Sequence, residues 1–430
     1  MIGAGPCGLA AVKNLLEAGC SDVTCYDEHS AIGGNWAFTD DPGRAGVHHR
    51  TRTISSRDMS SFPDFPMPGD FPDFPSHRQM LAYFTAYATA FGLWPHIRLG
   101  SRVERCTLDA DGRWLVRVRA HGVVRTETFD HLVVCSGHHR DPFVPEYPGR
   151  FGGSIVHSSA YRRPDPYRGS RVLVVGAGNS AADIAVDVAR VASRTVLSVR
   201  EGTYVVPNRV LGRPVDAVHA YWRRKLPDPL LRLALTSWLR VAVGGWDDYG
   251  LPAPRTAPLA KPPTVSSAVL AALRDGQVVA RPGIDRYEDL TVHFADGRSE
   301  EFDAVVMATG FRVSFPFLAG RIAGAPRYLS MMHPTIPSLY FIGLCQPIGC
   351  LWRLADHQAR LAALQITGRS RRPHDIEARI RRDTSRRRGP VHRSGIGVDY
   401  RTLERQLRRE IAAADDGRRP AAAARSTGHR

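Results

Sequence analysis

Two glycine-rich segments, each followed by a helix-like and then a strand-like run, constrain the fold of this chain more than any other feature of its sequence. The first opens the chain and contributes the candidate binding residues Gly3, Gly5, Pro6, Cys7 and Gly8. Apolar residues on one helical face follow, Gly19 is the predicted end of that helix, and a strand is predicted at 22–26. A G-x-G-x-x-G turn of this kind lets backbone N–H groups approach a pyrophosphate at the N-terminus of a helix.

An acidic residue, Asp27, comes directly after the predicted strand at 22–26. At this position a carboxylate would accept hydrogen bonds from the diol of a ribose. The alternative is a fortuitous glycine-rich turn, because the glycine pattern alone is weak evidence. The helix, the second strand and the acid together favour a dinucleotide site.

The same pattern recurs after a buried-strand run at 171–175, with the candidate binding residues Gly176, Gly178, Asn179 and Ser180. A helix is predicted from Ala182 to about Val191, and a strand at 195–199. This second pattern ends in Arg200, and a cation there favours the 2′-phosphate of NADP over NAD. The neighbouring Glu201 opposes that preference.

Two nucleotide sites in one chain suggest a flavoprotein that is reduced by a nicotinamide, with FAD at the first site and NADPH at the second. Two further segments, 132–137 and 304–310, each read as a short apolar strand that ends in a small residue and a glycine. Such strand ends let the backbone pass close to a nucleotide or connect two domains. Ordinary strand-to-loop glycines are the alternative.

The composition excludes several other classes of protein. The chain has 430 residues, of which 43% are hydrophobic and 23% charged, enough to bury a sizeable core. We expect neither a transmembrane segment nor a signal peptide, because no apolar run is long enough and no basic-then-apolar leader opens the sequence. Seven scattered cysteines without a C-x-x-C pair argue against a metal site and predict a reducing, cytoplasmic location.

The net charge of +16 is typical of nucleic-acid-binding proteins, but its distribution argues against that role. Most of the excess lies after Arg369, and residues 413–430 are predicted to form a basic, disordered tail. We therefore expect no nucleic-acid partner; a nucleic-acid or anionic-membrane role of the tail is the alternative.

A basic, leucine-rich segment at about 215–245 predicts a helical insertion, packed on the nicotinamide domain or at a homodimer interface. A membrane-surface helix is the alternative there.

The segment between the two glycine turns resembles the signature of the flavin-containing monooxygenases, which are class B flavoprotein monooxygenases. Residues 151–162 fit F-x-G-x-x-x-H-x-x-x-(Y/F), with His157 as the histidine. Other matching pieces, such as 33–36, 308–311 and 343–347, keep the family's order from Met1 to about Leu407. The related Baeyer–Villiger monooxygenases end the signature in Trp followed by Pro or Asp, whereas this chain has Tyr161-Arg162.

The resemblance implies an α/β fold of two Rossmann-like dinucleotide-binding domains, with the NADPH domain inserted into a discontinuous FAD domain. The FAD domain would comprise 1–166 and 306–412, and the NADPH domain 167–305. The expected activity is reduction of FAD by NADPH, formation of a flavin hydroperoxide with O₂, and transfer of one oxygen atom to the nitrogen or sulfur of a small molecule. Baeyer–Villiger oxygenation of a ketone, or NADPH oxidation without oxygen insertion, are the alternatives.

The resemblance also implies roles for individual residues. Trp36 would pack near the isoalloxazine and Gln346 would lie beside the flavin, while His157 would act as a linker near NADPH rather than as a general base. A satisfied structural histidine is the plain alternative for His157. The remaining implied cofactor-binding residues are Gly34, Asn35, Thr309 and Gly310.

The chain departs from the family pattern at two places. Ile54 stands where the family's T-N-x-S-K-E segment has an asparagine, and an aliphatic side chain cannot donate a hydrogen bond that would be worth about 1 kcal/mol. We count Ile54 and Gln346 as the candidate catalytic residues and expect more leakage to H₂O₂ than in relatives with asparagine, unless another donor compensates. Only Met1 and Ile2 precede the first glycine turn, so the first strand is expected to be truncated.

Overall fold

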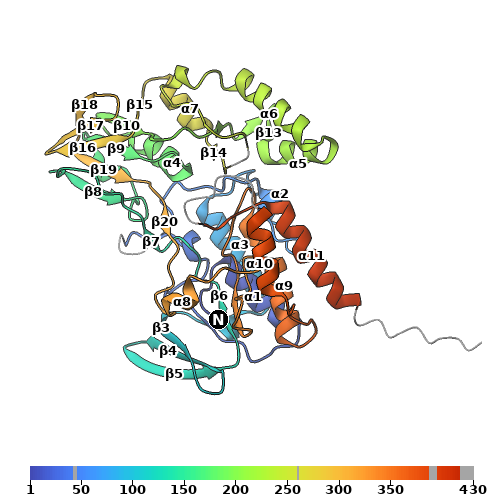
Figure 1. The fold of residues 1–430 in the computed structure, drawn as a ribbon. Helices are drawn as coiled ribbons and strands as arrows, with labels where there is room; N and C mark the ends of the chain where they lie inside the picture. The colour runs from blue at the N-terminus through green and yellow to red at the C-terminus, as the bar shows by residue number, and fades with distance from the viewer. Residues whose placement is uncertain (42–45, 259–260, 387–394, 417–430) are drawn as a thin grey trace, which may run out of the picture.

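The structure is a computed structural model that describes residues 1–41, 46–258, 261–386 and 395–416 (Figure 1). It contains two α/β units, which we call the first and the second unit. In Figure 1 the first unit lies below the second, and the short strands β7 (Asp141–Pro142) and β20 (Phe311–Arg312) lie between them. These two strands pair antiparallel. The chain thus passes between the units along two neighbouring connections.

The first unit is built on a parallel sheet with Ile2 at its centre. Ile2 forms parallel bridges to Tyr26 and Val134. On one side β1 (Cys25–Tyr26) pairs with β2 (Ile97–Arg98), and on the other β6 (Leu132–Val134) pairs with β21 (Leu339–Phe341). Strand β1 is shorter than the run predicted at 22–26. The expected truncation of the first strand stays a prediction.

Helices cover this sheet through apolar faces that form one core. Helix α1 (Pro6–Glu17) starts after Gly5 with proline in its first turn, and Gly19 at φ 87° ends it as predicted. Helix α3 (His77–Ala90) begins with a capping box, in which Ser76 and Gln79 each satisfy a backbone N–H of the other. Helix α9 (Leu351–Ile366) packs against α1 and carries buried residues along its length.

The C-terminal helix α11 (Tyr400–Asp416) corrects one prediction, because it continues past residue 412 where a disordered tail was expected. Leu403, Leu407, Ile411 and Ala414 recur at helical spacing and are buried against the core of the first unit. Burial of this apolar face stabilises the helix, although arginines occupy many of its other positions. The rest of the predicted tail, 417–430, lies outside the described residues.

The second unit is built on a five-stranded parallel sheet. Its order is β15 (Val279–Arg281), β10 (Arg194–Ser198), β9 (Arg171–Val175), β19 (Ala304–Met307) and β8 (Ser154–His157). Strand β8 thus joins this sheet although 154–157 was assigned to the FAD domain by the sequence analysis. It joins because all four of its residues pair in parallel with β19. The spacing of residues in the sequence does not reveal this pairing.

Two helices flank this sheet, α4 (Asn179–Val188) and α7 (Ser267–Arg274). Helix α4 starts three residues earlier than the predicted Ala182 and ends earlier than Val191. The cause is local, because Gly178 is extended at ψ 179° and serves as the N-cap, so helical geometry begins immediately after it.

The predicted helical insertion is a pair of helices, α5 (Val215–Lys225) and α6 (Asp228–Ala242), separated at Pro227. Leu239 and Val243 are buried in the core of the second unit, in agreement with an insertion packed on that unit. Other apolar side chains of the pair are exposed, among them Tyr221, Trp222 and Leu233. The membrane-surface alternative stays untested.

The remaining elements are short or peripheral. Two antiparallel meanders are β3 (Ser101–Leu108), β4 (Trp114–Ala120) and β5 (Val123–Phe129), and β16 (Ile284–Glu288), β17 (Thr291–Phe294) and β18 (Ser299–Glu301). The others are η1 (Gly34–Trp36), α2 (Arg57–Ser60), η2 (Trp94–His96), η3 (Asp165–Tyr167), β11 (Val205–Val206), β12 (Arg209–Val210), β13 (Arg213–Pro214), η4 (Asp247–Tyr249), β14 (Thr264–Val265), α8 (Gly320–Ala323), β22 (Gln346–Pro347), α10 (Ile376–Arg386) and β23 (Gly397–Val398). Among the described residues, no helix has the length and apolarity needed to cross a bilayer.

Candidate active site

The glycines of the first turn have separate structural reasons. Gly3 adopts φ 101°, and a Cβ there would lie 2.6 Å from the carbonyl oxygen of Cys135. A Cβ at Gly8 would overlap the carbonyl oxygen of Gly3, so a side chain is excluded where α1 crosses the turn. These two glycines therefore serve the packing of the turn itself.

Gly5 and Gly34 form a backbone-lined cradle at the N-terminus of α1. A Cβ built on Gly34, whose φ is 55°, would lie 3.2 Å from the Cα of Gly5. No side chain caps the first turn of α1, so the N–H groups of that turn are left to bind a ligand. The positive end of the helix dipole lies at the same end of the helix and favours an anion there. Pro6 and Cys7 occupy the first two helical positions. This arrangement fits the pyrophosphate of a dinucleotide such as FAD.

Asp27 is buried and makes two hydrogen bonds to the backbone. Its Oδ2 accepts from the N–H of Ala4 at 2.7 Å, and its Oδ1 accepts from the N–H of His29 at 2.8 Å. The carboxylate therefore fixes the glycine turn to the end of β1. Oδ1 also lies 3.0 Å from Nδ1 of His29, whereas Oδ2 keeps a second lone pair, so the predicted contact with a ribose stays compatible with this geometry.

The second turn has an open glycine. Gly176 adopts φ 143° and packs against the carbonyl group of Ala308, whereas a Cβ on Gly178 would have no neighbour within 4 Å. Helix α4 starts directly after Gly178 and has no side-chain cap. Asn179 contributes by positioning, because its Oδ1 accepts from the N–H of Val265 at 2.8 Å, and Ser180 is exposed. The turn fits the close approach of a phosphate.

Arg200 is exposed just after β10, at the edge where the ribose of a second dinucleotide would lie. Its neighbour Glu201 pairs with Lys261, whose Nζ lies 3.1 Å from Oε1 of Glu201. This hydrogen bond lowers the pKa of the Glu201 carboxyl. Glu201 thus has its own cationic partner. Its negative charge is therefore less able to repel the 2′-phosphate of NADP than the sequence alone suggests.

His157 ties the end of β8 to Gly310, the residue before β20. Its Nε2 is 3.0 Å from the carbonyl oxygen of Gly310, and its Nδ1 accepts from the N–H of Ser159 at 3.1 Å. Burial lowers the pKa of the imidazole, so the ring is neutral and both nitrogens are engaged. Beside it, Thr309 Oγ1 donates to the carbonyl oxygen of Phe143 at 2.5 Å. His157 is a satisfied histidine at the linker.

The residues expected near the flavin ring lie in the first unit. Trp36 ends η1 and contacts the ring of Trp352 edge-on at 6.0 Å, and Asn35 Nδ2 lies 3.3 Å from Nδ1 of His139. Gln346 starts β22 and donates its N–H to the carbonyl oxygen of Ile396 at 2.8 Å. Trp36 follows β1 and Gln346 follows β21, so both come after the carboxyl ends of parallel strands of the first unit.

Ile54 is 44% exposed, but its neighbours Thr53 and Ser56 are buried. Within the described part of the protein, Thr53 Oγ1 and Ser56 Oγ find no hydrogen-bond partner. Buried hydroxyls without a protein partner are uncommon and mark places where a ligand or water completes the bonding. The segment around Ile54 therefore has two donors that sequence reasoning did not consider.

The comparison with protein families decides what these features belong to. Residues 1–413 match the model of the flavin-binding monooxygenase-like family. The chain belongs to this family. It is therefore a flavin-dependent monooxygenase, which uses a flavin, O₂ and a small-molecule substrate.

Individual relatives agree with the family. The chain is 35% identical over 399 residues to dimethylaniline monooxygenase (N-oxide-forming) 2 of Rattus norvegicus, covering 87% of this chain and 74% of the relative. S-allyl-L-cysteine S-oxygenase from Allium sativum superposes with a TM-score of 0.71 at 23% identity, over 96% and 87% of the two chains. Cyclohexanone monooxygenase from Rhodococcus sp. Phi1 gives a TM-score of 0.72 at 17% identity, with 97% coverage of both. The predicted fold class is confirmed.

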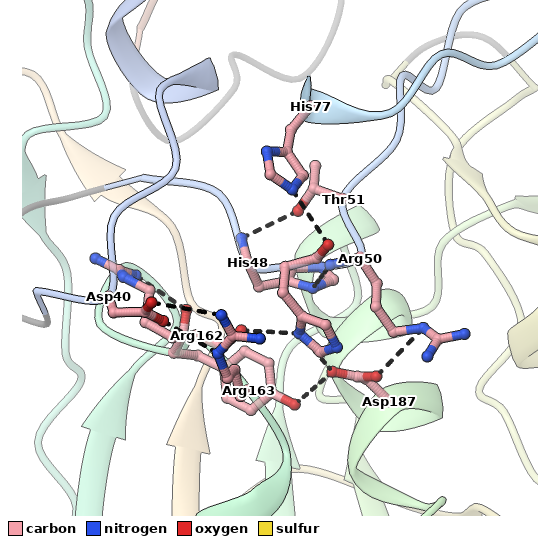
Figure 2. A network of polar contacts seen from close by, with 10 residues as sticks. Asp40, His48, Arg50, Thr51, His77, Arg162, Arg163 and Asp187 are labelled. Carbon is pink, nitrogen blue, oxygen red and sulfur yellow. Dashed lines mark hydrogen bonds and ion pairs between the residues drawn. The ribbon is translucent and has the colours of Figure 1, made fainter. Parts of the chain in front are cut away.

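The end of the family signature belongs to a polar network that the sequence analysis missed (Figure 2). Tyr161 donates its hydroxyl to Oδ2 of Asp187 on α4 at 2.8 Å, while the guanidinium of Arg50 lies 3.7 Å from Oδ1. His49 Nδ1 lies 3.0 Å from the carbonyl oxygen of Arg162 and 3.7 Å from Asp187. The network joins the segment 48–51 of the first unit to the second unit. Only the Tyr-Arg ending of the signature hinted at it.

The same place brings together three groups of the kind that bind metals, because donor atoms of His48, His49 and Asp187 lie within 4.8 Å of one another. The guanidinium of Arg50 and the hydroxyl of Tyr161 already contact the only carboxylate of this set. A cation would have to compete with that arginine, so the geometry fits an ion pair between the units better than a metal site.

Proposed function

We propose that the chain is an FAD- and NADPH-dependent monooxygenase that transfers one oxygen atom of O₂ to the nitrogen or sulfur of a small molecule. The observation that carries the proposal is the pair of uncapped glycine turns on two sheets, whose units are joined by the paired strands β7 and β20. The turns differ at the ribose position, with the acid Asp27 in the first and the exposed cation Arg200 in the second. This difference supports FAD at the first turn and NADPH at the second.

The residues of the chain would divide the work as follows. The Gly5–Gly34 cradle and the N-terminus of α1 would hold the pyrophosphate of FAD, and the open Gly178 with the N-terminus of α4 would hold that of NADPH. The bound flavin would supply the hydride acceptance and the oxygen chemistry. Trp36 and the apolar Ile54 would keep water from the reacting atoms, and Thr53 or Ser56 would offer a hydroxyl donor.

The substrate class is supported by relatives rather than by a pocket. The rat relative is named for N-oxide formation, and this chain shares the Tyr161 ending of the signature rather than the Trp of the Baeyer–Villiger enzymes. Oxygenation of a ketone is the alternative, and its support is the shared fold of the cyclohexanone monooxygenase from Rhodococcus. Oxidation of NADPH without oxygen insertion is favoured only by Ile54. The cytoplasmic location and the homodimer expected from the sequence stay predictions.

The cofactor assignment is tested by release and reduction. Flavin released from the purified protein by denaturation is expected to be FAD, and anaerobic NADPH is expected to bleach the bound flavin at least about tenfold faster than NADH at equal concentration. Release of FMN, or equal rates with both nicotinamides, would contradict the assignment. A matched pair of assays, with N,N-dimethylaniline and with cyclohexanone, separates the two substrate classes.

A further inference from the structure

The inserted helix α5 reaches across to the first unit through a carboxylate. Oδ2 of Asp216 accepts a hydrogen bond from the backbone N–H of Ser56 at 2.6 Å, and Oδ1 accepts from Ala217 at 2.8 Å. Ser56 is buried and lies two residues after Ile54. A residue of the second unit thus satisfies a buried backbone donor next to the candidate catalytic position.

The other anchors of this segment come from the first unit itself. The N–H of Thr53 donates to the carbonyl oxygen of Pro75 at 2.9 Å, and that of Arg57 donates to the carbonyl oxygen of Asp73 at 2.6 Å. These bonds hold the two ends of 53–57. Between them, the N–H of Ser56 depends on Asp216. A hydrogen bond to a carboxylate is stronger than one to a neutral acceptor, and a buried N–H without a partner is costly.

Two ion pairs with the first unit hold helix α5, which carries Asp216, and a strand that precedes it in position. Arg209, on β12, forms an ion pair with Asp73 at 2.5 Å, and Arg223, on α5, lies 3.5 Å from Asp399. The first contact is beside the 53–57 segment, whereas the second is next to β23, the partner strand of Gln346. Strand β12 and helix α5 therefore contact the first unit on two flanks of the candidate active site.

We propose that Asp216 is a positioning residue for oxygen transfer. It holds the 53–57 segment so that Ile54 and the buried hydroxyls of Thr53 and Ser56 keep one arrangement toward the flavin side. The fraction of NADPH oxidation that ends in oxygenated product then depends on a carboxylate of the nicotinamide-side unit. This inference rests on the proposed function, because it assumes that Ile54 faces the reacting atoms.

The experiment compares the FAD-loaded full chain with Asp216→Ala, which removes the acceptor, and Asp216→Asn, which keeps one acceptor oxygen. Asp248→Ala is the matched control, because Oδ2 of Asp248 accepts from the N–H of Gly245 at 2.9 Å within the second unit. Hydrogen exchange of the peptide that contains Ser56 is measured with and without cofactor. H₂O₂ formed per NADPH in the presence of N,N-dimethylaniline, and the anaerobic rate of flavin reduction, are measured in parallel.

In Asp216→Ala the Ser56 amide is expected to exchange about tenfold faster or more, and Asp216→Asn should recover most of the protection. The H₂O₂ yield of Asp216→Ala should rise by about twofold or more, while the rate of flavin reduction changes by less than about twofold. Asp248→Ala should match the unmodified chain in both measurements. These results would support a positioning role rather than a general loss of structure.

Unchanged exchange at Ser56 would overturn the inference, since the hydrogen bond would have no consequence. An unchanged H₂O₂ yield despite faster exchange would overturn it as well, as would an equal fall in flavin reduction and in product. A different failure concerns the proposed function. If the unmodified protein itself forms no product and returns all NADPH equivalents as H₂O₂, the monooxygenase assignment is overturned, whatever the exchange at Ser56.

Discussion

We expect the single residue Arg200 to decide the nicotinamide preference, because the competing Glu201 is paired with Lys261 at 3.1 Å. Arg200→Ala is expected to raise the KM for NADPH by about 10- to 100-fold and to change that for NADH by less than about threefold. Lys261→Ala, which releases Glu201, should shift the preference in the same direction by a smaller factor. Steady-state kinetics with both nicotinamides measures this. Equal effects on NADPH and NADH would show that Arg200 does not contact the 2′-phosphate.

The substitution Ile54→Asn tests whether the missing amide matters. An asparagine would restore a hydrogen-bond donor, worth about 1 kcal/mol if the bound flavin excludes water from this 44% exposed position, and should lower the H₂O₂ formed per NADPH by up to about fivefold. Ile54→Leu is the matched control, because it keeps the apolar character and volume. An unchanged H₂O₂ yield in Ile54→Asn would contradict a need for the amide donor. It would mean that the hydroxyls of Thr53 and Ser56 already supply a donor in its place.

A carboxyl group on α4 gives stability a distinct pH dependence. Burial, with a smaller effect of the nearby Asp187, raises the pKa of Asp183 from 3.8 to about 7. The folded state therefore binds a proton more tightly than the unfolded state, so this group's contribution to stability is full below about pH 4 and is lost as the pH rises to about 7. Between pH 5.5 and 7.5 the loss amounts to about 2 kcal/mol.

Asp183→Asn should remove this loss, so that its free energy of unfolding in urea falls less than that of the unmodified chain between pH 5.5 and 7.5. Asp275→Asn, which replaces an exposed carboxylate of the same unit, should follow the unmodified chain. Parallel pH profiles of Asp183→Asn and the unmodified chain would mean that Asp183 ionises in the folded state as it does in the unfolded chain.

At the residue scale, the sequence predicts positions whose chemistry is local and misses those that depend on distant partners. The glycine turns follow from backbone geometry, and Gly3, Gly8 and Gly176 lie where a Cβ would meet neighbouring atoms, whereas their predicted contact with a cofactor stays a prediction. Asp187 and Asp216 carried no local signal, because their partners, Tyr161 and Ser56, come from elsewhere in the chain.

Helix α11 is the element whose stability the sequence analysis underestimated. Leu407 is fully buried against the core of the first unit, and α11 packs on α9. Leu407→Ala should lower the free energy of unfolding by about 2–5 kcal/mol, because it leaves a cavity in a packed core. The control Arg409→Ala removes an exposed side chain of the same helix and should change it by less than about 0.5 kcal/mol. Urea unfolding measures both; equal small effects would mean that α11 is not part of the core.

Element types were easier to predict than element ends. Strand β9 has the predicted bounds because its apolar run lies between Arg171 and the turn glycine Gly176, whereas β1 has two residues instead of five. The start of α4 depends on the extended Gly178, and the assignment of β8 depends on pairing with β19, 150 residues later in the chain. Pairing over such a distance leaves no periodic mark in the local sequence.

At the scale of the whole molecule, the two repeated glycine patterns predicted the two units, and the family signature predicted their connection. The arrangement of the units relative to each other rests on contacts such as Arg50–Asp187 and Asp216–Ser56. These contacts join polar residues that look like ordinary surface residues in the sequence. The positions of the predicted cofactor-binding residues therefore could be anticipated, but not the contacts that hold the two units together.

The most direct test of the monooxygenase account is the fate of oxygen during turnover. FAD-loaded protein with NADPH and N,N-dimethylaniline is allowed to react under ¹⁸O₂, and the product and the NADPH consumed are quantified by mass spectrometry and absorbance. We predict an N-oxide that carries one ¹⁸O atom and whose amount rises with the NADPH oxidised. NADPH consumption with all equivalents recovered as H₂O₂, and no labelled product from amines, thioethers or ketones, would contradict it.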